Sequence, residues 1–154
     1  MLVLLAIANT APIAAKRLFR KRFSAPLDGG LVFLDGRPLF GPSKTVRGIL
    51  AALLVTTACA PLIGLEWAAG ALIASVAMVG DLFSSFLKRR MKLTSSSKAT
   101  GLDQVPESLF PALACRNLLS LSFVDIIVCV VVFFIGEVIL ARLAYKLHFR
   151  DRPY

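Results

Sequence analysis

Residues 80–104 read GDLFSSFLKRRMKLTSSSKATGLDQ, and this stretch decides how the rest of the chain is interpreted. An apolar segment runs into Asp81 and ends in three consecutive cations at 88–90. Asp81, Ser84, Ser85 and Lys88 are spaced i, i+3, i+4 and i+7, so a helix places them on one face. A carboxylate, two hydroxyls and a cation at a membrane surface suit a metal-bound polyphosphate. The stretch therefore predicts a membrane helix with one polar, functional face.

The composition is that of an integral membrane protein. Of the 154 residues, 57% are hydrophobic, and the mean hydropathy is +0.77. These values exclude an ordinary soluble domain and favour an all-α, polytopic helical bundle. The net charge is +9 and the pI about 10.1. In a membrane protein, excess Lys and Arg first indicates cytoplasmic loops and then an anionic lipid or phosphate substrate, rather than nucleic acid.

Cysteine and histidine do not form a metal-binding pattern. Cys59, Cys115 and Cys129 lie far apart in apolar surroundings, and His148 has no neighbouring ligand. We expect reduced, structural cysteines and no zinc site. At the N-terminus the basic residues follow the apolar run instead of preceding it, so we expect a retained first helix rather than a cleaved signal peptide.

The apolar stretches predict about five transmembrane helices in a single membrane-embedded domain, 1–154. The stretch 105–119 is the weakest, because Pro106, Pro111 and Arg116 interrupt it. Without it the chain would cross four times and its basic tail would lie outside. The predicted spans are 1–17, 48–65, 67–87, 105–119 and 121–143, joined by cytoplasmic loops at 18–47 and 88–104.

The distribution of cations sets the predicted orientation. Lys and Arg cluster at 16–22, 37–47, 88–98 and 142–152. The positive-inside rule places all four clusters on the cytoplasmic side. Five crossings satisfy this requirement, with the N-terminus out and the C-terminus in. We therefore expect a multi-pass protein of the cytoplasmic (inner) membrane whose functional site faces the cytoplasm.

Residues 41–48, GPSKTVRG, form a second motif at the start of a predicted helix. They are not a phosphate-binding P-loop, because Pro42 stands where that motif requires lysine. The motif instead predicts a turn that places Lys44 and Arg47 at a helix N-terminus, whose free N–H groups favour an anion. The alternative is that both cations simply anchor the helix.

Two aspartates complete the predicted site. A carboxylate within a membrane span costs about 2.5–3.5 kcal/mol at mid-membrane, so Asp81 must be compensated by a cation, a cavity or a metal. Asp103, next to Gln104, is expected at the same face, and two carboxylates beside phosphate-binding cations suggest Mg²⁺ ligands. The alternatives are an ion pair of Asp81 with Lys88 or Arg47, and a helix-cap role for Asp103.

A family resemblance follows from these motifs taken together. The chain resembles the archaeal CDP-archaeol synthases and their bacterial relatives, integral-membrane cytidylyltransferases related to phosphatidate cytidylyltransferase. The pairing of the 80–90 motif with Asp103-Gln104 is the most specific part. The matching segments are 8–12 (ANTAP), 35–41 (DGRPLFG), 44–45, 47–48, 80–90, 103–104 and 150–154 (RDRPY).

The resemblance implies a reaction in which CTP and a membrane lipid phosphate give a CDP-activated lipid and pyrophosphate, with Mg²⁺ as cofactor. The attacking phosphate oxygen is already an anion, so positioning and charge neutralisation suffice. The implied metal ligands are Asp81 and Asp103, with Lys88 as a third catalytic residue. The implied substrate-binding residues are Asn9, Lys44, Thr45, Arg47, Ser85, Arg89, Arg90 and Gln104.

Two other functions are open at this point. A non-catalytic protein that binds anionic or phosphorylated lipids would need the cations but not both aspartates. A small ion-coupled transporter would use Asp81 and Glu137 as relay carboxylates, although Glu137 also has a basic residue, Arg142, with which to pair. A homodimer is compatible with a site open to lipid.

Overall fold

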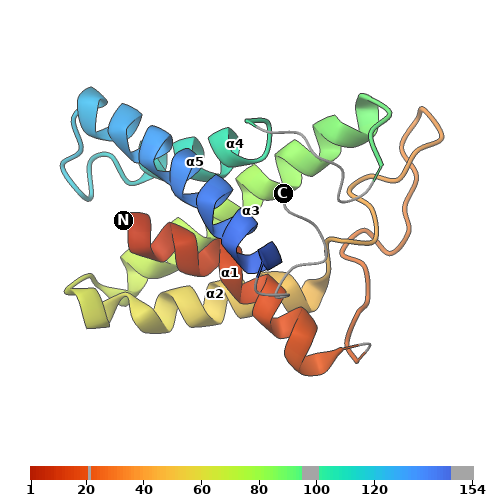
Figure 1. Ribbon diagram of the computed structural model, residues 1–154, viewed down its shortest axis with the longest axis horizontal. Coiled ribbons are helices and arrows are strands. Elements are labelled where there is room, and N and C mark those ends of the chain that lie inside the picture. Colours follow the sequence, from red (N-terminus) through yellow and green to blue (C-terminus); the bar gives the residue numbers. More distant parts are fainter. Residues whose placement is uncertain (21, 95–100, 147–154) are drawn as a thin grey trace.

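The structure is a computed structural model that describes residues 1–20, 22–94 and 101–146. Within these residues every regular element is a helix, which confirms the predicted all-α fold (Figure 1). The motif at 150–154, His148 and part of the loop before Asp103 lie outside the described residues. The helices are α1 (Leu2–Phe19), α2 (Val46–Cys59), a short 3₁₀ helix η1 (Pro61–Ile63), α3 (Trp67–Arg90), α4 (Gln104–Ala114) and α5 (Phe123–Lys146).

Consecutive α-helices run in alternating directions (Figure 1). α1, α3 and α5 point one way and α2 and α4 the other, so the start of α1 and the end of α5 lie at opposite ends of the bundle. Four segments are long and apolar enough to cross a membrane, namely α1, α2 with η1, α3 and α5. The protein is therefore a multi-pass membrane protein.

The predicted span 105–119 contains a helix that is shorter than the apolar stretch, α4. α4 has 11 residues, about 16 Å of helix, and does not by itself cross a hydrocarbon core of about 30 Å. It still returns the chain toward the end of the bundle where α5 begins (Figure 1). The predicted loop 88–104 also begins later than expected, because α3 continues to Arg90. The three cations thus occupy the last turn of α3, where they interact favourably with the negative end of the helix dipole.

Close packing of the helices depends on small residues at their contacts. Leu4, Leu5 and Ala8 of α1 are fully buried. A Cβ at Gly70 would lie 2.6 Å from the Cβ of Ala60, so only glycine lets α3 approach the end of α2 this closely. Such contacts are typical of membrane helices, which associate through packing rather than through a hydrophobic driving force.

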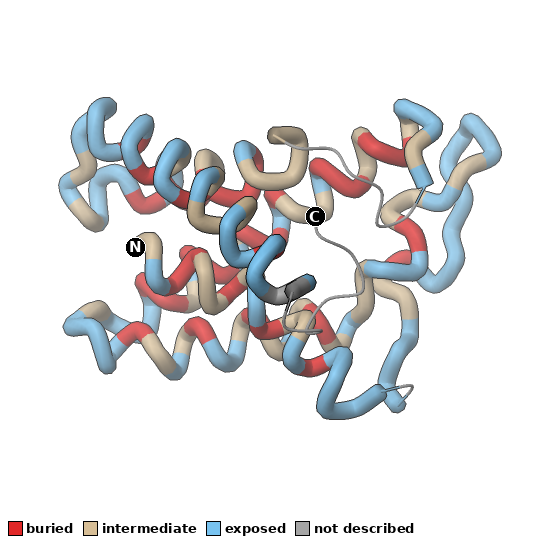
Figure 2. The backbone as a smooth tube through the Cα atoms, in the orientation of Figure 1, coloured by how far each residue is buried: buried red, intermediate tan, exposed pale blue. Residues whose placement is uncertain are grey.

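The outer surface of the bundle is apolar. Along α5, Ile127, Val131 and Ile139 are all about half exposed, and Figure 2 shows pale, exposed backbone over much of this helix. In water such a surface would be unstable, whereas in lipid it is the expected exterior. The three cysteines are free, as predicted.

Candidate functional site

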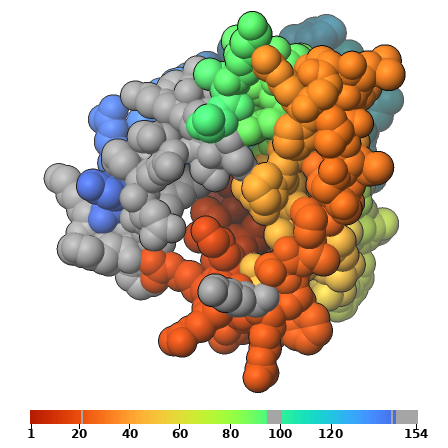
Figure 3. Space-filling view, turned by 90° about the vertical axis from the view of Figure 1, so that its right-hand side faces the viewer, coloured from red at the N-terminus to blue at the C-terminus, as the bar shows by residue number. Residues whose placement is uncertain are grey.

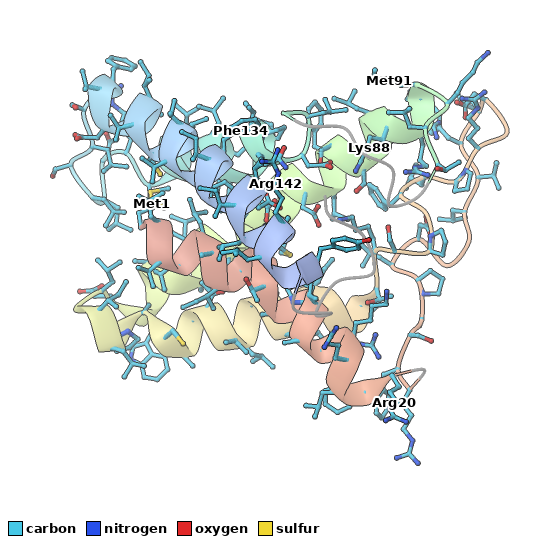
Figure 4. All side chains as sticks on the ribbon, in the orientation of Figure 1. Met1, Arg20, Lys88, Met91, Phe134 and Arg142 are labelled. Atoms are coloured by element: carbon cyan, nitrogen blue, oxygen red, sulfur yellow. The ribbon has the colours of Figure 1, made fainter. Side chains whose placement is uncertain are left out.

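The polar face of α3 points into the protein. Ser84 and Ser85 are 0% and 2% exposed, and Lys88 is 7% exposed, while Asp81 is half-buried. Phe83, on the opposite side of the helix, is 43% exposed. Figure 4 shows the Lys88 side chain pointing from α3 toward the interior of the molecule. The helical spacing therefore brings these four residues together on a buried face, as the sequence predicts.

Asp81 forms an ion pair with Lys44. The Lys44 Nζ atom donates to both carboxylate oxygens, at 2.5 Å from Oδ1 and 2.6 Å from Oδ2. Each side chain is 23% exposed. The sequence suggested Lys88 or Arg47 as the partner, and neither fills that role. Lys44 reaches Asp81 because the 41–44 turn brings it to the N-terminal end of α2, beside α3.

A second ion pair joins Lys88 to Asp103. The Lys88 Nζ atom lies 2.8 Å from Oδ2, to which it donates a hydrogen bond, and 2.7 Å from Oδ1. Oδ1 is buried and accepts no hydrogen bond. Asp103 is the residue immediately before α4, and its side chain makes no capping hydrogen bond. The structure therefore shows Asp103 facing α3 rather than capping its own helix.

The charge on Lys44 depends on its surroundings. Burial opposes the protonated form, but the charge and hydrogen bonds of Asp81 outweigh it and raise the pKa of Lys44, with smaller contributions from the charges of Glu107 and Asp103. Lys44 is thus a permanent cation. Three carboxylates and two ammonium groups share this region.

Glu107 is a site residue that the sequence analysis missed. It lies in the first turn of α4, is 3% exposed, and interacts electrostatically with Asp81, Asp103, Lys44 and Glu137. A carboxylate inside a membrane protein is a functional signal in its own right. The signal was overlooked because Glu107 stands in the Pro-rich stretch that was assigned to a weak span.

Gly80 brings α3 and α4 together at this point. A Cβ built on Gly80 would lie 2.4 Å from the carbonyl oxygen of Pro106 and 2.9 Å from the Cα of Glu107. The two backbones therefore touch directly beside Asp81. This contact holds α4 against α3, so that Glu107 lies beside the polar face of α3.

Asp28 organises the loop that carries Lys44, and the sequence analysis missed it as well. It is 6% exposed, and its carboxylate accepts hydrogen bonds from the backbone N–H groups of Gly30, Phe40 and Gly41 at 3.1, 3.0 and 2.9 Å. Burial opposes ionisation, but these hydrogen bonds outweigh it and lower the pKa of Asp28. The sequence Asp28-Gly29-Gly30 read only as a turn signal, although a buried loop aspartate is a common backbone organiser.

Backbone hydrogen bonds within the same loop also fix the segment around Lys44. The N–H of Leu27 donates to the carbonyl of Lys44 at 2.8 Å, and the N–H of Val46 donates to the carbonyl of Ala25 at 3.2 Å. The side chain of Thr45 accepts a hydrogen bond from the N–H of Gly48 at 3.2 Å and caps α2. Thr45 thus shapes the helix start that presents Lys44.

The three arginines predicted to bind substrate contact loop backbone in this structure. Arg47 donates to the carbonyls of Arg20 and Arg22 at 3.1 and 2.5 Å. Arg89 donates to the carbonyl of Thr94 at 2.9 Å. Arg90 pairs with Asp35 at 2.7 Å and lies over the rings of Phe33 and Phe86. Arg89 also interacts electrostatically with Asp103 of the second ion pair.

Two predicted residues remain, Gln104 and Asn9. Gln104 accepts a hydrogen bond from the N–H of Gly101 at 2.8 Å and so orders the approach to α4. Asn9 is half-buried on α1. Figure 3 looks onto the end of the bundle that carries the ion pairs and shows that it is hollowed. α1 (red) lies at the bottom of the hollow, and the segment that follows α1 (orange) lies along one side.

The donor set fits a magnesium ion that also binds substrate phosphates. Among the described residues, no three Asp, Glu, His or Cys side chains are arranged to hold a metal by themselves. Asp81 and Asp103 nevertheless supply hard oxygen ligands, and each faces a lysine ammonium, which shows that both carboxylates already hold a cationic partner at this end of the bundle. Mg²⁺ is usually held by one or two carboxylates together with phosphate oxygens, which is the donor set that these two aspartates and a bound polyphosphate would provide.

Comparison with known proteins agrees with this architecture. Residues 65–154 match the family model described as CarS-like, CDP-archaeol synthase. The CDP-archaeol synthase of Sulfurisphaera tokodaii is 33% identical over 135 residues, which cover 84% of this chain and 81% of the relative. That of Thermofilum pendens is 32% identical over 155 residues, covering 96% of this chain and 76% of the relative.

A solved structure supports the same assignment. It is described as an intramembrane enzyme for archaeal membrane lipids biosynthesis, and it superposes with a TM-score of 0.71 at 27% sequence identity. The match covers 94% of this chain and 92% of the other. With a matching family model over more than half of its length, the chain belongs to the CarS-like CDP-archaeol synthase family.

Proposed function

We propose that this protein transfers CMP from CTP to a membrane lipid phosphate, forming a CDP-activated lipid and pyrophosphate. The observation that carries the proposal is the pair of partly buried lysine–aspartate contacts, Lys44 with Asp81 and Lys88 with Asp103, at one end of a membrane bundle. Family membership independently favours this reaction over a binding-only protein or an ion-coupled transporter.

The chemistry needs no dedicated nucleophile on the protein. An oxygen of the lipid phosphate, already negatively charged, attacks the α-phosphorus of CTP. A new P–O bond forms, the bond from the α-phosphorus to the bridging oxygen breaks, and pyrophosphate leaves with the electron pair. The protein must bring two anions together and stabilise the charge that develops on the pyrophosphate.

The residues have complementary roles in this proposal. Asp81 and Asp103 would hold Mg²⁺, which when bound neutralises triphosphate charge. Lys44 and Lys88 would bind phosphate oxygens of the substrates. In the free protein each lysine ammonium is paired with an aspartate carboxylate. In the proposal, that carboxylate would bind the metal instead. Glu107 lies buried beside both aspartates, where burial and the neighbouring carboxylates raise its pKa well above the usual range, so it favours the neutral carboxylic acid until a cation binds.

The site would face the cytoplasm, where nucleotide is available, in the cytoplasmic membrane. The cation-rich ends of α1 and α3, together with the start of α2, lie on this side, which supports that orientation. A homodimer is a separate proposal, and light scattering in detergent tests it directly.

The test is to incubate the purified protein with Mg²⁺, each radiolabelled nucleoside triphosphate, and ether- and ester-linked lipid phosphates. A labelled nucleotide-lipid and pyrophosphate, formed with CTP and lost in Asp81→Asn, would support the proposal and name the lipid. Folded protein that binds lipid phosphate but forms no product with any combination would overturn it.

A further inference from the structure

A rigid hairpin projects from the end of the bundle that carries the ion pairs. In residues 31–39, the N–H of Leu39 donates to the carbonyl of Leu31 at 3.0 Å, and that of Phe33 donates to the carbonyl of Arg37 at 2.8 Å. Val32 and Pro38 form an antiparallel bridge. The backbone of this 31–39 hairpin is thus set by its own hydrogen bonds.

The first half of the 31–39 hairpin, from Leu31 at its base to Leu34 at its tip, is apolar and exposed. Leu31, Val32 and Leu34 are 65%, 59% and 97% exposed. Figure 2 shows this part of the loop pale throughout, at the far end of the molecule from the start of α1. Such a run of uncovered apolar side chains outside the membrane helices marks an interaction surface.

The other face of the hairpin is fixed to α3. The rings of Phe33 and Phe86 lie edge to face with centroids 5.3 Å apart. Arg90 donates to Asp35 at 2.7 Å and to the carbonyl of Pro38 at 2.8 Å. Arg37 donates to the carbonyl of Arg89 at 3.2 Å. None of these contacts with α3 involves Leu31, Val32 or Leu34, which remain exposed.

These contacts set the depth of the hairpin in the membrane. α3 has 24 residues, about 36 Å of helix, so its last turns extend beyond a hydrocarbon core of about 30 Å into the headgroup region. The hairpin contacts Phe86 and Arg90 in these last turns. Its tip is consequently held at the depth where a bilayer offers both apolar contacts and phosphate groups.

The charge around the tip also suits a lipid surface. Two arginines form the contact between the hairpin and α3, namely Arg37 of the hairpin and Arg90 of α3. The exposed Lys92 follows α3 two residues later. Cations beside apolar side chains are the pattern by which interfacial segments bind bilayers with anionic headgroups.

We propose that the 31–39 hairpin is an interfacial anchor that inserts Leu31, Val32 and Leu34 into the headgroup region of the same bilayer that holds the helices. By fixing the loop to the membrane surface, it sets the height of the segment that ends in Lys44. The proposal depends on the protein being in a membrane and not on the reaction it catalyses.

The test uses tryptophan as a depth reporter. Trp67 is the single tryptophan of the chain, so Trp67→Phe provides a silent background in which to introduce Leu34→Trp. The protein is reconstituted into vesicles of phosphatidylcholine and phosphatidylglycerol, with bromine atoms placed either near the headgroup or in mid-chain. Ile127→Trp, on the exposed side of α5, is the matched control in the same background.

We expect Leu34→Trp to emit at shorter wavelength in vesicles than in unfolded protein, and to be quenched more by shallow than by mid-chain bromine. Ile127→Trp should show the stronger mid-chain quenching. Emission that stays at long wavelength and is quenched only by aqueous iodide would overturn the proposal. So would short-wavelength emission that neither bromolipid quenches, because protein, such as a second copy, would then cover the tip.

Val32→Trp is a second reporter in case Leu34→Trp disturbs the turn. Val32 and Leu34 are both exposed apolar residues of the hairpin, so both reporters should give the same order of quenching. A different order at the two positions would also count against insertion. None of these readouts requires CTP or product, so failure of the anchor and failure of the proposed reaction are separate results.

Discussion

Lys44 and Asp81, 37 positions apart in the chain, form a bidentate ion pair in which one ammonium lies 2.5 and 2.6 Å from the two carboxylate oxygens. Lys44 belongs to a loop and Asp81 to the third helix. The pair closes the loop that precedes α2 onto the polar face of α3. The same lysine that fixes the loop to α3 is thus one of the residues proposed to bind phosphate.

Lys44→Met should abolish most of the activity while leaving the fold intact. The substitution keeps the length of the side chain and removes the charge that would stabilise phosphate oxygens, so product formation should fall about 100-fold or more. The measurement is the initial rate of CDP-lipid formation at saturating CTP. Lys92→Met, on an exposed lysine outside the ion pairs, is the control, and equal rates in the two variants would contradict the role of Lys44.

Mg²⁺ should be required, and its concentration dependence should report on Glu107. Removal of divalent ions with EDTA should stop the reaction and added Mg²⁺ should restore it. Burial and the neighbouring carboxylates raise the pKa of Glu107, so Glu107 favours the neutral form and would ionise when Mg²⁺ binds beside it. Glu107→Gln removes that ionisable group, so half-saturation by Mg²⁺ should move to higher concentration. Glu66→Gln, an exposed carboxylate at the opposite end of α3, should titrate like wild type. An unchanged Mg²⁺ curve in Glu107→Gln would remove that residue from the site.

Gly80→Ala should destabilise the protein by about 1–3 kcal/mol or more, because the new methyl group meets the Pro106 backbone, which cannot rotate away. Gly136→Ala is a matched control in α5, where a Cβ meets nothing within 4 Å. Thermal unfolding in detergent measures both. If the two variants melt at the same temperature, the close α3–α4 contact is not what holds α4 in place.

Asp28→Asn should lower the free energy of unfolding by about 2 kcal/mol at neutral pH, because the amide accepts the backbone hydrogen bonds less strongly than the carboxylate. The pKa of Asp28 is depressed in the folded protein, so its contribution is complete above the unfolded pKa of about 4. It is lost as pH falls through the lower, folded pKa.

The difference in unfolding free energy between wild type and Asp28→Asn should therefore be constant from neutral pH down to about pH 5 and shrink below about pH 4. Melting curves across this pH series measure it. Asp35→Asn tests an aspartate of the same loop that is more exposed, with 37% of its side-chain surface accessible. A difference that grows on acidification would contradict the assigned direction of the Asp28 pKa.

Local sequence was a good guide where one helix determines the outcome. The spacing of Asp81, Ser84, Ser85 and Lys88 was enough to place them on one buried face, because helical geometry relates residues three and four apart without reference to the rest of the protein. The same reasoning was weaker at 105–119, where prolines and a glutamate interrupt the apolar pattern. There the short helix α4 and the site residue Glu107 emerged only from the structure.

The sequence by itself determined that the chain is an all-helical membrane protein with a cationic, carboxylate-bearing end, because hydropathy and charge act locally on each segment. Which lysine meets which aspartate was decided by tertiary structure alone. Lys44 lies beside Asp81 because Asp28 binds the backbone of Gly41 and so orders the loop that carries Lys44. Asp103 lies beside Lys88 because Gly80 lets the backbone of α4 pack directly against α3. Such pairings depend on contacts between segments distant in the chain, which no local pattern encodes.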